Sequence, residues 1–142
     1  MTITQAPADI LSTALLAGRH LSSHSYNMAL YMSEVSLGSG STRYLTASET
    51  SGSGYTAGGQ EITSYALARS GSTSYLNWAD AVWPASTFSA AGCIIYNESL
   101  TSNEALGVYA FGSSVEVSAG TFTAVLPPAS ATSAVIRVGA GT

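Results

Sequence analysis

Two histidines four residues apart are the first side chains in this sequence whose spacing could serve chemistry. His20 and His24 have the i, i+4 separation that places two imidazoles on one helix face, as in zinc metalloprotease helices. Those helices carry a glutamate directly after the first histidine as general base, and Leu21 stands there. Gly18 is also expected to end the preceding helix before the two rings share a face. We therefore interpret both histidines as solvated residues at a helix exit, with a partial metal site as the alternative.

The other candidate motifs are also incomplete. Residues 52–58 (GSGYTAG) resemble a phosphate loop, but a dinucleotide-binding loop opens a helix, and a Walker A loop needs a lysine that this chain lacks. We interpret this stretch as the connection of a β-hairpin. Cys93 lies in an apolar run and is expected to be a buried, unreactive thiol. The Asn97-Glu98-Ser99 glycosylation sequon is interpreted as a chance match. We predict no enzyme activity, no cofactor and no metal, with His20, His24, Asp80 and Cys93 dispensable for any chemistry.

The two tryptophans leave two interpretations open. Trp78 and Trp83 bracket a short segment, and eight tyrosines are spread over the chain. Exposed aromatic rings on a β-sandwich could stack on pyranose faces, which would make this a sugar-binding surface. Alternatively, Trp78 is a core residue and Trp83-Pro84 anchors a hairpin loop, since large aromatics dominate core packing.

The charge content excludes several partners. The 142 residues include four Arg, no Lys and eight acidic residues, with a net charge of −4. So few cations cannot neutralise many phosphates, which argues against nucleic acid and against anionic membrane surfaces. No apolar run approaches the ~18 residues of a membrane span, and a single cysteine excludes an intrachain disulfide. The first residues carry no basic segment before their apolar stretch, so we expect no secretory signal.

The hydrophobic period predicts one helix followed by strands. Apolar residues with i, i+3, i+4 spacing predict an amphipathic helix over residues 7–18, with Pro7 in its first turn. The period then changes to two, with glycine-rich turns between the apolar runs. Strands are expected around residues 26–32, 61–68, 73–79, 88–96, 106–111, 115–117, 121–126 and 134–138, and a short run lies at 42–47. This pattern predicts an all-β, jelly-roll-like antiparallel β-sandwich of about eight strands (25–142), preceded by an N-terminal arm (1–24).

Turn and strand signatures along most of the chain resemble a family of small virion structural proteins of tailed bacteriophages. The matching segments are residues 10–20, 26–31, 49–59, 83–97, 111–112, 120–123 and 134–137. The chain departs from the family pattern at Met28, where the family carries lysine. The resemblance implies a jelly-roll-like β-sandwich that sits on the particle, as a head cement or decoration protein does. It transfers no functional residues.

Composition favours the same class of function. A weakly charged domain with abundant apolar residues is poorly protected as a free monomer, but suits a permanently covered surface. We expect a homo-oligomer, a dimer or trimer, that binds the phage major capsid protein or other virion proteins and is assembled in the bacterial host cytoplasm. The expected interface comprises Ile10, Leu11 and Leu15, whose apolar stripe lies outside the sandwich pattern, and Trp83. A tail-associated or carbohydrate-binding adhesion module is the alternative.

Overall fold

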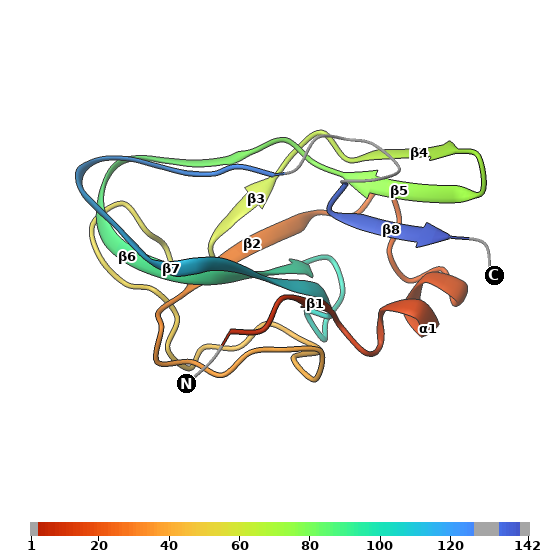
Figure 1. The fold of residues 1–142 in the computed structure, drawn as a ribbon, viewed down its shortest axis with the longest axis horizontal. Coiled ribbons are helices and arrows are strands. Elements are labelled where there is room, and N and C mark those ends of the chain that lie inside the picture. The colour runs from red at the N-terminus through yellow and green to blue at the C-terminus, as the bar shows by residue number, and fades with distance from the viewer. Residues whose placement is uncertain (1–2, 127–133, 140–142) are drawn as a thin grey trace.

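The protein folds as an antiparallel β-sandwich with one short helix, which confirms the predicted fold class (Figure 1). The structure, a computed structural model, describes residues 3–126 and 134–139. The elements in chain order are β1 (Ala6–Pro7), α1 (Leu11–Leu16), β2 (Tyr26–Tyr31), β3 (Gln60–Ile62), β4 (Ala66–Ser70), β5 (Thr73–Asn77), β6 (Ala81–Asn97), β7 (Ala105–Ala124) and β8 (Ile136–Gly139). Among the described residues, none of the helical structure is long and apolar enough to cross a membrane.

The strands form two sheets. The larger has five strands in the order β1-β7-β6-β2-β3, and the smaller has three in the order β4-β5-β8. All pairs of neighbouring strands are antiparallel. The β6–β7 hairpin lies at the centre of the larger sheet, so its closed end is held from both sides, by β2 next to β6 and by β1 next to β7.

Strands β6 and β7 are much longer than predicted and bend together. Figure 1 shows them turning at one end of the molecule, so that the start of β6 and the end of β7 run back toward the smaller sheet. Both strands contain an alanine with positive φ near this bend, Ala85 (φ 48) and Ala119 (φ 49), where the strand register also shifts. Bulges of this kind increase the local twist and redirect a strand. Trp83-Pro84 therefore lies inside β6 rather than in the predicted hairpin loop.

The larger sheet is covered on both faces. Tyr26, Met28 and Leu30 of β2 point into one hydrophobic cluster, whereas Ala29 and Tyr31 point into another. The first cluster holds both tryptophans, and the second is covered by the N-terminal arm and the long connection over residues 32–59. Two-sided burial was predicted for residues 88–96 from their apolar character on both faces, and the structure confirms it there.

The N-terminal arm is more closely joined to the sandwich than expected. The helix is shorter than the predicted 7–18, because Pro7 pairs with β7 in a two-residue strand instead of starting the helix. Leu11 belongs to the main core cluster, so the expectation that its side chain lies outside the core is wrong. The predicted strand over 61–68 is divided into β3 and β4, with Ser64 at positive φ between them.

Candidate functional site

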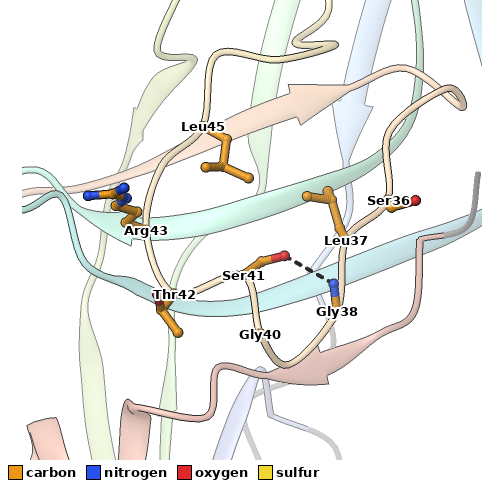
Figure 2. Close-up of a pocket in the computed structure, with 8 residues that line it drawn as sticks. All are labelled: Ser36, Leu37, Gly38, Gly40, Ser41, Thr42, Arg43 and Leu45. Carbon is orange, nitrogen blue, oxygen red and sulfur yellow. Dashed lines mark hydrogen bonds between the residues drawn. The ribbon is translucent and has the colours of Figure 1, made fainter.

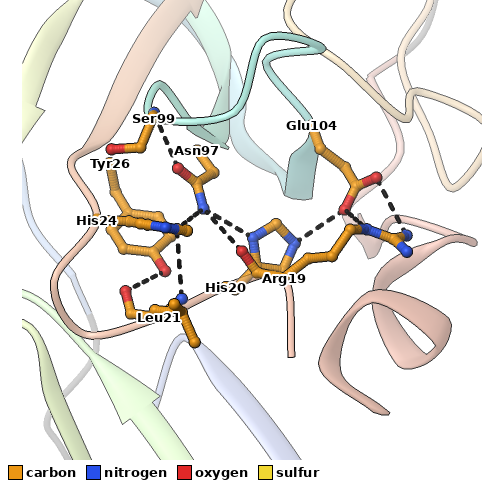
Figure 3. Close-up of polar contacts among 8 residues, drawn as sticks. All are labelled: Arg19, His20, Leu21, His24, Tyr26, Asn97, Ser99 and Glu104. Carbon is orange, nitrogen blue, oxygen red and sulfur yellow. Dashed lines mark hydrogen bonds and ion pairs between the residues drawn. The ribbon is translucent and has the colours of Figure 1, made fainter. Parts of the chain in front are cut away.

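The end of the N-terminal arm meets the β6–β7 hairpin in a cluster of polar side chains (Figure 3). Gly18 has φ +70 and ends α1, where its amide donates to Leu15 O and the Arg19 amide donates to Ala14 O. This is the Schellman pattern, for which glycine is favoured because it adopts positive φ without strain. The turn directs residues 19–24 across the closed end of the hairpin, where Asn97 ends β6 and Glu104 precedes β7.

Asn97 is the centre of this cluster. Its side chain is fully buried, and its Oδ1 accepts a hydrogen bond of 3.0 Å from the Ser99 amide, which fixes the orientation of the side-chain amide. Its Nδ2 then lies 3.1 Å from His20 Nδ1 and 2.9 Å from His24 Nδ1. Because an amide nitrogen can only donate, both Nδ1 atoms must accept, and the proton of each neutral ring sits on Nε2.

The opposite edge of the His20 ring faces an ion pair. His20 Nε2 lies 3.3 Å from Glu104 Oε1, and the Arg19 guanidinium donates from Nε and Nη2 to the two carboxylate oxygens, each at 3.2 Å. Burial lowers the pKa of His20 below 6.5, and it outweighs the attraction of Glu104, which raises that pKa. Arg19 and His24 lower the pKa further. The ring is therefore held neutral.

The arrangement corrects the interpretation of His20 as a solvated residue. The residue as a whole is 7% exposed, and its side chain is fully enclosed by Asn97, Glu104 and the surrounding chain. The two Nδ1 atoms do point toward a common position, but the amide nitrogen of Asn97 lies there, where a metal ion bound by both imidazoles would have to lie. Among residues 3–126 and 134–139, no group of three or more His, Cys, Asp or Glu side chains could hold a metal ion. What the cluster can do is fasten the arm and respond to protons.

A second polar cluster fastens the connection between β2 and β3. The carboxylate of Glu49 accepts hydrogen bonds from Tyr44 Oη (2.7 Å), Tyr55 Oη (2.6 Å) and the Gly58 amide (2.7 Å). Burial raises the pKa of both tyrosines, and the bond to Glu49 raises it further, so the hydroxyls remain donors. The glycine-rich segment predicted as a hairpin connection is part of this loop, which does join two adjacent antiparallel strands.

The other candidate residues for chemistry are buried or hold the backbone in place. Cys93 is buried, as predicted, and burial raises the pKa of its thiol to about 12. Asp80 accepts a 2.7 Å hydrogen bond from the Leu126 amide, which holds the start of β6 against the end of β7. The sequon asparagine, Asn97, is fully buried and cannot accept a glycan in this fold.

The predicted interface residues are divided between core and surface. Trp83 is 3% exposed and packs against Phe88 and Phe122, and Trp78 is equally buried, which confirms the core interpretation of Trp78. Trp83 therefore offers no ring to a sugar or to a partner. Leu11 is likewise buried, whereas Ile10 and Leu15 are partly exposed. Their interface role stays a prediction, and the helix also exposes the large apolar side chain of Leu16, which was not among the predicted interface residues.

A shallow cavity of about 600 Å³ lies in the connection after β2 (Figure 2). Small and apolar residues of the segment 36–45 line it, with Arg43 as the one charged side chain among the lining residues. The Gly38 amide donates to Ser41 Oγ across the turn at 3.1 Å. The cavity contains none of the predicted site residues.

No protein-family model, curated protein sequence or solved structure matches the chain.

Proposed function

We propose that this protein is a non-enzymatic structural component of a tailed-phage particle, a capsid cement or decoration protein that acts as a homo-oligomer on the head shell. The observation that carries the proposal is a set of large apolar side chains exposed on a sparsely charged chain. Leu16 is 92% exposed, Val125 75% and Leu67 65%, in a chain with only 8% charged residues. The resemblance of the sequence to small virion proteins supports the same assignment.

The exposed apolar residues are spread over several elements rather than gathered at one cleft. Leu16 lies on α1 and Leu67 on the outer strand of the smaller sheet, while Val115 and Val125 border an apolar groove along β7 with Phe111. A subunit in a lattice has several neighbours, so several small apolar contacts suit it better than a single binding pocket would.

Buried apolar area is the expected driving force. A patch of roughly 800 Å² per partner contributes about 20 kcal/mol gross at ~25 cal/mol per Å². Association entropy offsets much of this, so one contact binds only weakly or moderately. Repeated copies on a symmetric shell strengthen attachment through effective concentration. Because so few charges are available for steering or pairing, binding should change little with salt.

The test adds purified protein back to particles that lack it, across a series of salt concentrations. We expect binding that is nearly independent of salt and that raises the resistance of the particles to heat and chelators. A matched pair of variants on α1 sharpens it: Leu16→Ala removes an exposed apolar side chain and should weaken binding, whereas Thr13→Ala on the same helix should not. Particles that are equally resistant without the protein would refute the cement role. Strong weakening by salt would leave the role standing but refute the hydrophobic mechanism.

A further inference from the structure

We propose that His20, His24 and Asn97 form a proton-operated latch that holds residues 19–25 against the β6–β7 hairpin at neutral pH and opens this junction in mild acid. The inference rests on the geometry of the cluster and is independent of the proposed function (Figure 3).

The latch works because the Asn97 amide needs a hydrogen-bond acceptor at Nδ1 of the buried His20 ring. Asn97 Nδ2 faces both Nδ1 atoms, at 3.1 and 2.9 Å, and donates to each. Protonation of the His20 ring converts its Nδ1 from an acceptor into a donor, so two N–H groups then face each other. Rotating the Asn97 amide by 180° does not remove this conflict between donors, because its NH2 group would then face the Ser99 amide that now donates to Oδ1. Mild acid therefore leaves a buried donor without an acceptor, which is costly.

The charged groups around His20 do not rescue the protonated ring. Glu104 faces it from the hairpin and attracts the cation, but the same carboxylate is already engaged by both nitrogens of Arg19. Arg19 and His24, on the junction itself, repel the cation. The centroid of the uncharged Tyr26 ring of β2 lies 6.3 Å from that of the His20 ring. Burial is the largest influence on the pKa of His20, and it lowers that pKa below 6.5.

The sign of the pH effect follows from that shift. A histidine whose pKa is lowered in the closed state binds protons better when the junction is open, so protons favour opening. The stabilisation is complete above about pH 6.5, the ordinary value, and is lost as the pH falls through the lower pKa of the closed state.

The opening is confined to the junction. The contacts that would be released with it include the Arg19–Glu104 ion pair (3.2 Å) and the hydrogen bonds from Ser25 N to Ser99 Oγ (2.8 Å), from Glu98 N to Ser25 O (2.9 Å) and from Tyr26 Oη to Leu21 O (2.8 Å). The rest of the arm has its own attachments, since β1 pairs with β7 and Leu11 lies in the core. The sandwich therefore remains folded while the junction opens.

Hydrogen exchange of the full-length protein measures the opening directly. Protection factors are compared at about pH 7.5 and about pH 5.5, because they correct for the pH dependence of the intrinsic exchange rate. For a proton taken up only in the open state with a pKa of 6.5, the opening constant rises up to about tenfold over this range. We expect peptides over residues 19–25 to lose protection by up to that factor, while peptides over 92–96 in β6 keep theirs. Unchanged protection of 19–25 would overturn the proposal.

Two variants separate the latch from general acid sensitivity. In His20→Asn, the side-chain Oδ1 takes the place of Nδ1 as acceptor but does not titrate, so most of the pH-dependent loss of protection should disappear. In Asn97→Asp, the carboxylate accepts from protonated Nδ1 groups and keeps the bond from Ser99, so the trend should reverse and protection of 19–25 should increase toward acid. A loss toward acid that is the same in both variants and in the unmodified protein would refute the latch.

A measurement on the unmodified protein guards against variants that fail to fold. Nitrogen chemical shifts of the imidazoles distinguish a protonated Nε2 from a protonated Nδ1 at neutral pH. The latch requires the Nε2–H form for both His20 and His24. Finding Nδ1–H in either ring would contradict the hydrogen-bond arrangement on which the proposal depends.

Discussion

Replacing Leu11 by alanine tests whether the N-terminal arm is part of the core or only an appendage for docking. Leu11 is 6% exposed and packs in the cluster that holds Tyr26 and both tryptophans. A six-residue helix is not stable by itself, so its stability must come from this packing. Truncating a buried leucine costs about 2–5 kcal/mol, because the lost transfer free energy adds to that of the cavity left behind.

The expected shift is large enough to measure by thermal unfolding. At roughly 3 °C per kcal/mol for a chain of this size, Leu11→Ala should lower Tm by about 6–15 °C. Leu16→Ala on the same helix is the matched control, since the Leu16 side chain is almost fully exposed and alanine favours helix; it should change stability by no more than about 0.5 kcal/mol. Circular dichroism melts of the two variants decide the question. Equal Tm values for Leu11→Ala and the unmodified protein would show that the arm does not share the core.

Three further predictions concern backbone and thiol. Gly59→Ala should cost more than about 4 kcal/mol of unfolding free energy in denaturant titrations, since its Cβ would clash with the Met28 carbonyl oxygen of β2. Gly71→Ala, at φ +59 in open space, should cost about 1 kcal/mol. Cys93 should react with a thiol reagent only after unfolding, because its raised pKa of about 12 and its burial suppress the thiolate; rapid labelling of the native protein would contradict this. Ala119→Gly should raise the unfolding free energy by about 0.5–1 kcal/mol by relieving a positive φ, whereas Ala66→Gly in β4 should lower it; a loss in both would refute the strain argument.

The elements that the sequence predicts well are those with an uninterrupted local signal. Alternating apolar residues identify β2, the apolar character of both faces identifies the buried half of β6, and Gly18 marks the end of the helix, as its φ of +70 confirms. The short helix itself follows from the spacing of Leu11 and Leu15, although Pro7 pairs with a strand because β7 offers it an unpaired edge. These features depend on neighbouring residues, which a single sequence displays.

Features that depend on distant pairing leave no such signal. The bend of β6 and β7 uses Ala85 and Ala119 at positive φ, where a sequence analysis looks for glycine or asparagine. The polar cluster joins His20 to Asn97, which are 77 residues apart, and their meeting depends on the register of the hairpin against the arm. The histidines attracted attention through their i, i+4 spacing, but the spacing indicated a helix face, whereas both rings lie beyond the helix end and share an amide.

A few ionisable groups of this chain lie where segments distant in sequence meet, whereas most of its Arg, Asp and Glu side chains are exposed. Arg19, His20 and Glu104 join the arm to the hairpin, and Glu49 joins Tyr44, Tyr55 and the glycine-rich segment in the connection after β2. Such groups are costly to bury unless each is paired, so they favour one arrangement of the chain over its alternatives. The chain has only four arginines and eight acidic residues in all, so uncharged side chains make up most of its surface. The two polar junctions therefore fix how distant segments meet, while Leu16, Leu67 and Val125 are exposed on a sparsely charged surface, where they are available for apolar contacts.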